Sequence, residues 1–145
     1  MSSYSYLINK DGNRFYPVTK SEIHEVEKNL NLKLPIELVN LYLEVGYGFI
    51  KGSEYNINRI MDPLSIRDFR LRLNDYEFYP DIELYDDLEV NKLIFFEGSE
   101  SALMSIELTQ NNKSPIYYGE LKIADSLTSF LSKIQDNDEY YLNFF

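Results

Sequence analysis

The sequence predicts an α+β fold: one domain spanning residues 1–145, in which several helices pack on a mixed or antiparallel sheet. The chain has 145 residues, 44 % hydrophobic and 15 % aromatic, so a single domain can bury a substantial core. No internal repeat, low-complexity tract or Pro/Gly/Ser-rich linker divides it. Helical apolar spacing comes first, strand-like runs follow, and a helical pattern closes the chain. This order favours α+β over alternating βαβ units.

The N-terminal part predicts two short strands and then a helix. The stretch YSYLINKDGNRFYPV (4–18) resembles two strands around the turn-favouring pair Asp11-Gly12. Thr19 and Glu22 then form the capping box T-K-S-E, which predicts a helix beginning after Thr19. Asn31 is a suitable C-terminal residue for that helix. Its apolar face consists of residues at helical spacing: Ile23, Val26 and Leu30.

A second helix is predicted within LKLPIELVNLYLEVGYG (32–48). Pro35 suits the first turn of a helix, where its missing N–H is not needed. The expected apolar face is Leu38, Leu41, Tyr42 and Val45, and the expected polar face is Glu37, Asn40 and Glu44. Gly46 and Gly48 follow this helix at the negative end of its dipole. Phosphate-binding loops precede a helix, so these glycines indicate a helix stop.

The central part is ambiguous between helix and strand. YNINRIM (55–61) reads as a strand that ends at the turn-forming pair Asp62-Pro63. After Pro63, the spacing of Ile66, Phe69 and Leu73 favours a helix. The stretch RDFRLRLND also alternates as a strand would, so both conformations stay open.

The last third predicts strands followed by a helix. LIFF (93–96) and ALMSIEL (102–108) read as neighbouring strands, and Pro115 precedes a short strand, IYY (116–118). The final helix is expected to begin at Asp125, a favourable N-cap. Its apolar face is Leu127, Phe130, Leu131 and Ile134. The ending DNDEYYLNFF either docks on the domain or forms a free aromatic tail.

Composition excludes several classes of function. The chain has no cysteine, which removes disulfides, thiolate metal sites and cysteine nucleophiles. Its start has no basic region leading into an apolar one, and no stretch approaches the roughly 20 apolar residues of a membrane span. We therefore expect a cytoplasmic protein that does not span a membrane. With 24 acids against 14 bases and a net charge of −10, binding of nucleic acid is disfavoured.

Little in the sequence suggests catalysis. His24 is the one histidine and falls on the polar side of the first predicted helix, so tetrahedral zinc and Ser-His-Asp sites are not expected. Nucleotide-binding glycine motifs are absent as well. Glu97 and Glu100 could form a hydrolytic carboxylate pair, although a solvated turn is the more common meaning of such a pair. We expect no cofactor, no metal and no catalytic residue.

The most distinctive stretch is DYEFYPDIELYDDLE (75–89), which contains seven acids and no base. It is either a solvated loop or an acidic, aromatic-bearing surface for a basic protein, since carboxylates steer a partner and tyrosines supply contact area. Arg67, Arg70 and Arg72 lie close before it and are expected to pair with acids of the chain itself. The candidate partner-binding residues are Asp75, Glu77, Tyr79, Asp81, Glu83, Tyr85, Asp86, Asp87 and Glu89.

Three stretches together resemble the SUKH superfamily, the Smi/Knr-type cell-wall assembly or glucan-synthesis regulator domain. They are TKSEIHEVEKNLNLKLPIELVNLYLEVGYG, LIFFEGSESALMSIEL and IADSLTSFLSKI, and the resemblance runs from about residue 19 to 134. It implies an α+β domain without enzyme activity. Bacterial members are similar to immunity proteins that neutralise toxins, often nucleases or deaminases, whereas fungal members resemble regulators of cell-wall synthesis.

The chain could accordingly be an immunity protein that binds a basic, nuclease-type toxin, or a regulatory or scaffold protein of the glucan-synthesis type. A carboxylate hydrolase using Glu97 and Glu100 is a third hypothesis. The partner implied by the first hypothesis is a protein, with neither nucleic acid nor membrane involved. The oligomeric state is left open.

Overall fold

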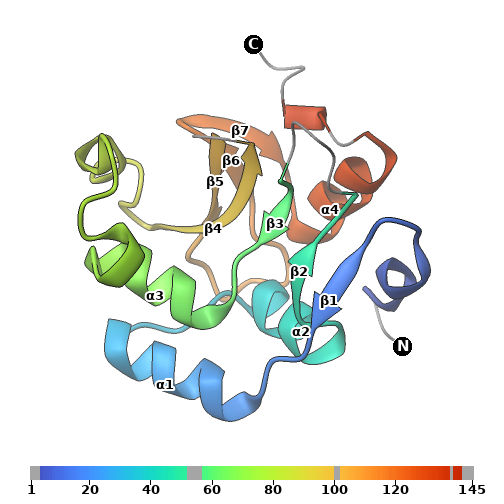
Figure 1. Ribbon diagram of the computed structural model, residues 1–145, viewed down its shortest axis with the longest axis horizontal. Helices are drawn as coiled ribbons and strands as arrows, with labels where there is room; N and C mark the ends of the chain where they lie inside the picture. The colour runs from blue at the N-terminus through green and yellow to red at the C-terminus, as the bar shows by residue number, and fades with distance from the viewer. Residues whose placement is uncertain (1–3, 52–56, 100–101, 138, 142–145) are drawn as a thin grey trace.

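A computed structural model describes residues 4–51, 57–99, 102–137 and 139–141 of the protein (Figure 1). Its α-helices are α1 (Lys20–Leu30), α2 (Ile36–Glu44), α3 (Pro63–Leu71) and α4 (Leu127–Asp136). Its 3-10 helices are η1 (Ser5–Asn9), η2 (Asn74–Tyr76) and η3 (Ile82–Tyr85). Its strands are β1 (Arg14–Tyr16), β2 (Tyr47–Phe49), β3 (Arg59–Ile60), β4 (Lys92–Ser99), β5 (Ala102–Glu107), β6 (Ile116–Tyr118) and β7 (Leu121–Ala124). The predicted α+β class is confirmed.

The seven strands form one antiparallel sheet whose spatial order is the order of the sequence, from β1 to β7. The longest pairing joins β4 to β5, where Leu93 lies opposite Ile106 and Glu97 opposite Leu103. In Figure 1, α1 and α2 lie together at one end of the molecule and α4 lies beside the sheet. Each strand therefore pairs with the strand that comes before or after it in the sequence. The α-helices pack against this sheet.

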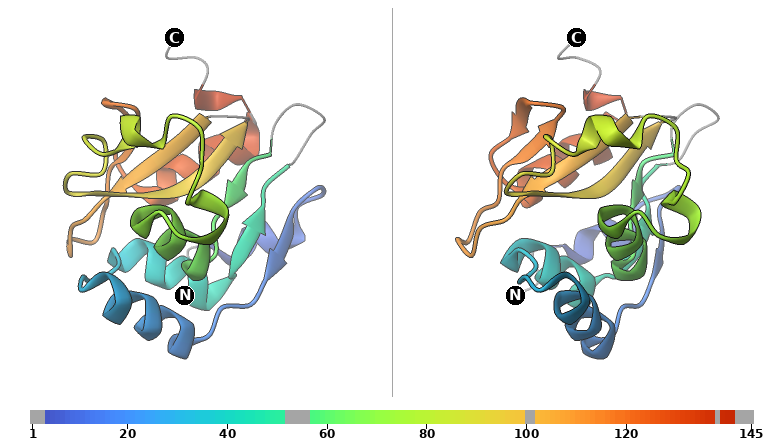
Figure 2. Two further views of the ribbon diagram at one scale, coloured as in Figure 1. Left: turned by 60° about the vertical axis from the view of Figure 1, so that its left-hand side comes forward. Right: turned by 90° about the vertical axis from the view of Figure 1, so that its left-hand side faces the viewer.

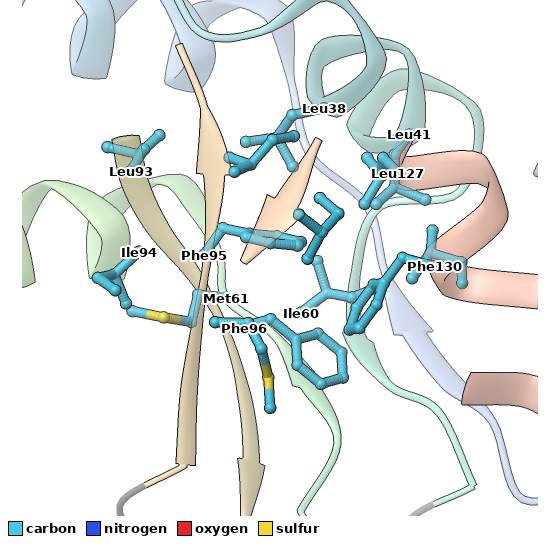
Figure 3. Packing of buried hydrophobic residues seen from close by; sticks show 14 of the residues in the cluster. Leu38, Leu41, Ile60, Met61, Leu93, Ile94, Phe95, Phe96, Leu127 and Phe130 are labelled. Atoms are coloured by element: carbon cyan, nitrogen blue, oxygen red, sulfur yellow. The ribbon is translucent and has the colours of Figure 1, made fainter. Parts of the chain in front are cut away.

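The core forms where β4 meets α2 and α4 (Figure 3). Phe95 and Phe96 on β4 are both fully buried. The ring of Phe96 packs edge-to-face against Phe130 of α4, with ring centroids 5.0 Å apart. Leu38 and Leu41 of α2, also fully buried, lie in the same cluster. The apolar faces that the sequence assigned to these two helices thus meet across β4.

The capping signals in the sequence locate both ends of α1, and they locate the start of α4 to within one residue. Thr19 caps α1 as predicted, because its side chain accepts a hydrogen bond from the Glu22 N–H at 3.1 Å. Asn31 ends α1 in the left-handed conformation that the sequence suggested. Helix α4 begins one residue later than predicted: Ser126 is the N-cap. Asp125 instead forms an ion pair with Lys122 at 3.1 Å.

The N-terminal prediction was wrong in part. Residues 14–16 form β1, but residues 5–9 form the 3-10 helix η1 in place of a first strand. Leu7 is buried, and its carbonyl accepts a hydrogen bond from the Asn13 side chain at 2.8 Å. The backbone N–H of Tyr4 donates to Glu44 of α2. These contacts hold the segment against α2 and the turn before β1.

The ambiguity after Pro63 resolves as helix α3. The side chain of Asp62 caps it by accepting from the Ser65 N–H, and Arg72 ends it in the left-handed conformation. Strand β7, by contrast, was not predicted. Part of the expected strand 55–61 and most of the C-terminal ending lie outside the described residues. Within the ending, Tyr141 is buried and packs edge-to-face against Tyr118, so that residue docks on the sheet.

Gly46 and Gly48 have a role beyond ending α2. The Gly46 N–H donates to the Leu41 carbonyl at the end of α2, which confirms the helix stop. Both glycines have positive φ angles, 111° and 148°. A Cβ atom would lie 1.9 Å from the Tyr16 carbonyl oxygen at Gly46, and 2.0 Å from the Arg14 carbonyl oxygen at Gly48. Side chains there would force β1 away from β2.

Replacing Gly48 with alanine should lower the free energy of unfolding by about 2–3 kcal/mol, because backbone strain and a backbone clash act together. Gly119→Ala is the matched control: Gly119 also has positive φ, at 62°, but no atom lies within 4 Å of its added Cβ. Urea unfolding followed by circular dichroism compares the two variants. Equal losses would show that the close approach of β1 contributes nothing.

Candidate partner-binding surface

The acidic segment, residues 75–89, is the connection from α3 to β4. In both views of Figure 2 it passes in front of β4 and β5, while α4 lies behind them. It contains η3 and the end of η2, and is otherwise built of turns. The segment therefore covers the sheet on the face opposite α4.

Burial along the acidic segment repeats every three residues. The half-buried positions are Tyr76, Tyr79, Ile82, Tyr85 and Leu88, and they alternate with pairs of more exposed positions up to residue 87. Backbone hydrogen bonds follow the same spacing: Ile82 N–H donates to the Tyr79 carbonyl at 3.3 Å, and Leu84 N–H to the Asp81 carbonyl at 3.0 Å. A 3-10 helix has three residues per turn, which accounts for the repeat within η2 and η3, and the turns between and after them keep the same period.

Three tyrosines hold the acidic segment on α3. The rings of Tyr76, Tyr79 and Tyr85 pack edge-to-face against Phe69, with centroid distances of 5.1, 5.9 and 5.5 Å. Burial raises the pKa of the Tyr76 and Tyr85 hydroxyls. Tyr79 and Tyr85, two of the candidate contact residues, thus have a structural role as anchors.

The side chains that face solvent are of two kinds. Six of the seven acids are exposed: Asp75, Glu77, Asp81, Glu83, Asp86 and Asp87. Among the large hydrophobic side chains of the described residues, the three most exposed are Phe78 (87 %) and Leu84 (67 %) in the segment and Val90 (69 %) directly after it. The exposed surface is therefore acidic and apolar, and Phe78 is its aromatic side chain, whereas the tyrosines of the segment are half-buried.

The seventh acid, Glu89, is buried beneath the segment. Arg72 Nη2 lies 2.8 Å from Asp86 Oδ1 and 3.0 Å from Glu89 Oε2, so one arginine joins both carboxylates. Arg70 donates to the Lys92 carbonyl at 2.7 Å, and Arg67 pairs with Asp68 at 3.0 Å. Arg67 and Arg72 thus pair with acids of the chain, as predicted. The contacts of Arg72 fix the segment from below, and those of Arg67 and Arg70 lie outside it.

Glu89 carries an electrostatic cost. Its Oε1 atom is buried without a hydrogen-bond partner among the described residues. Burial raises the pKa of its carboxyl, and the favourable charge of Arg72 offsets this only in part. The folded protein consequently holds this proton more tightly than the unfolded chain does. The contribution of Glu89 to stability is present below the unfolded pKa near 4.5 and is lost as the pH rises through the folded pKa.

Glu89→Gln should therefore gain stability relative to the wild type as the pH rises from 4 to 7. The amide keeps the size of the side chain and cannot ionise. Urea unfolding at several pH values measures the difference, and Glu83→Gln, at an exposed acid of the same segment, controls for the change in net charge. If the stability difference between Glu89→Gln and the wild type stayed constant with pH, it would contradict the electrostatic cost assigned to the buried Glu89 carboxylate.

The other candidate chemistry does not assemble into a site. His24 is exposed on α1, as predicted. Glu97 Oε1 lies 3.4 Å from Arg59 Nε, in an ion pair. Glu100 falls outside the described residues. Among the residues that the structure describes, no three His, Cys, Asp or Glu side chains cluster in a way that could hold a metal ion. The same residues include no helix with the length and apolarity to cross a membrane.

Sequence reasoning missed one important residue, Glu37. It was placed on the polar face of α2, and that placement was wrong, because its side chain is only 5 % exposed. Its Oε1 accepts from the N–H groups of Ser114 (2.6 Å) and Leu127 (3.0 Å). Its Oε2 accepts from the Thr128 N–H (3.2 Å) and Oγ1–H (2.9 Å). Glu37 thus joins α2 to the first turn of α4, where a negative charge is favourable.

Comparison with known proteins gives two positive findings. Residues 20–131 match the family described as SUKH_6, SMI1-KNR4 cell-wall. The chain is also 72 % identical, over 141 residues, to a protein of Bacillus subtilis (strain 168) named immunity protein YxxD; the match covers 97 % of this chain and 96 % of that protein. No solved structure matches the chain.

Proposed function

This chain belongs to the SUKH_6 (SMI1-KNR4 cell-wall) family, and from this premise we propose that it is an immunity protein that binds and neutralises a toxin. The observation that carries the proposal is its 72 % identity to immunity protein YxxD along nearly the whole of both chains. The proposed role is one of binding, without catalysis, in the cytoplasm. The toxin would be inactivated because the bound chain occupies or distorts its functional surface.

The proposed partner is a basic, nuclease-type toxin. Nuclease domains bind phosphate backbones mainly through lysine and arginine, so such a toxin presents a positive surface. This chain has a net charge of −10, and seven of its acids lie in the acidic segment. Opposite fields speed association and orient the two proteins. The candidate residues that we retain for direct contact are the exposed acids Asp75, Glu77, Asp81, Glu83, Asp86 and Asp87.

Three candidate residues take a different part in the proposed interface. Tyr79 and Tyr85 pack on Phe69 and hold the segment in place. Glu89 pairs with Arg72 beneath the segment. We propose that these three support the binding surface from behind, while the acids in front of them meet the toxin.

The proposed function predicts a toxin gene beside this chain's gene, and co-expression of the two tests it. Cells that produce the toxin alone should stop growing, and cells that also produce this chain should grow. A chain that accumulates in folded form and gives no rescue would overturn the immunity role. The family description favours a cell-wall regulator as the second candidate. That role predicts a cell-wall operon beside the gene and an envelope defect when the gene is deleted.

A further inference from the structure

We propose that a contact strip of alternating acidic and apolar side chains on the outer side of the acidic segment is the centre of the toxin interface. The inference rests on the proposed function and deepens it, because it assigns the chemistry of the surface that the partner must match. The contact strip consists of Asp75, Phe78, Asp81, Leu84, Asp87 and, directly after the segment, Val90.

The contact strip follows from the three-residue repeat. Its six members are each three positions apart, and all six are exposed. Only Asp75 and Leu84 lie in 3-10 helices, η2 and η3, and along the turns between and after them the same three-residue period holds for which side chains are exposed. The half-buried row that begins at Tyr76 has the same spacing and packs towards the core. One row therefore anchors the segment and the other is displayed, with an acid and an apolar residue in turn.

Phe78 is the strongest anchor candidate. Large exposed apolar side chains that gather in one place mark interaction sites more often than scattered ones do. Phe78 is 87 % exposed, although Tyr76 and Tyr79 on either side of it pack on Phe69. Its backbone is thus held in place before any partner binds. Such preorganisation reduces the entropy lost on association, and aromatic anchors commonly dominate interface energetics.

The alternation defines the kind of partner. Asp75, Asp81 and Asp87 form no ion pair within the described part of the chain. Their charges are available to a partner, and an apolar residue follows each of them along the strip. The complementary toxin surface has an apolar hollow for Phe78, with lysine or arginine side chains around it. A uniformly basic, flat surface would leave the phenylalanine in contact with charge.

Phe78→Ala tests the inference with the purified toxin domain encoded beside this chain's gene. Because Phe78 is almost fully exposed, the variant should unfold at the wild-type denaturant concentration. We expect its dissociation constant to rise at least about tenfold, mainly through faster dissociation, with the salt dependence of association unchanged. Leu43→Ala is the matched control: Leu43 is an exposed apolar residue on α2, away from the strip, and its variant should bind as the wild type does.

The outcomes separate this inference from the proposed function. Wild-type binding by Phe78→Ala, in a chain that still rescues growth, would overturn the contact strip and leave the immunity role in place. Equal weakening by Phe78→Ala and Leu43→Ala would also overturn it, because the effect would not be specific to the strip. A wild-type chain that neither rescues growth nor binds the toxin domain would overturn both.

Discussion

Glu37→Gln should lower the free energy of unfolding by about 3–4 kcal/mol, since buried donors left without an acceptor cost about 1–3 kcal/mol each. The carboxylate of Glu37 accepts hydrogen bonds from Ser114, Leu127 and Thr128. A glutamine of the same size keeps one acceptor oxygen and turns an NH2 group towards the remaining donors. The loss is a large share of the roughly 5–15 kcal/mol that stabilises a typical domain.

Chemical denaturation followed by circular dichroism measures this loss. Glu25→Gln is the matched control, because Glu25 is exposed on α1 and should change the stability by less than about 0.5 kcal/mol. Hydrogen exchange in Glu37→Gln should quicken first at the start of α4, where the carboxylate accepts from backbone N–H groups. Glu37→Gln with wild-type stability would show that water or neighbouring groups replace those hydrogen bonds.

Asp81→Lys combined with Asp87→Lys should slow association with the toxin domain by about tenfold or more at low salt, since steering by opposite charge raises on-rates by about 10–1,000-fold. The slope of association rate against salt concentration should also flatten. Both aspartates are exposed, so the folded structure should persist. Their replacement removes two attractive charges from the contact strip and adds two repulsive ones.

Kinetic binding measurements at several salt concentrations test this expectation. Asp11→Lys combined with Glu120→Lys changes the net charge equally at exposed positions outside the acidic segment. This control should show a much smaller effect. If both double variants slow association to the same extent, the net charge of the chain governs the encounter and the acidic segment has no special part in it.

The sequence predicted those parts of the fold that local rules determine. Thr19 and Glu22 located the start of α1, and Gly46 located the end of α2, because caps depend on residues close together in the chain. The 3-10 helix η1 was missed because a hydrogen bond from the Asn13 side chain to Leu7 and a distant one from Tyr4 to Glu44 hold it, and neither follows from local spacing. Strand β7 was missed as well, and its pairing with β6 is seen only in the structure.

The charge of residues 75–89 indicated the candidate surface. It did not indicate which side chains of the segment are half-buried and which are exposed. Apolar and aromatic residues at every third position, Tyr76 through Leu88, were visible in the sequence, yet this period matches neither an α-helix nor a strand. The placement of Glu37 failed for a related reason. It lies three residues after Leu34 and four before Leu41, on the apolar side of α2, and its acidic type suggested solvent. Buried carboxylates depend on donors from distant segments, which local pattern does not reveal.

Hydrogen exchange of the chain, measured with and without the toxin domain encoded beside its gene, tests the central claim most directly. It reports in one measurement whether the two proteins bind and where. We expect slower exchange across residues 75–90 in the complex, with unchanged exchange on the exposed side of α1. Exchange that is identical in the two samples, or protection confined to other segments, would contradict the assignment of the acidic segment as the toxin-binding surface.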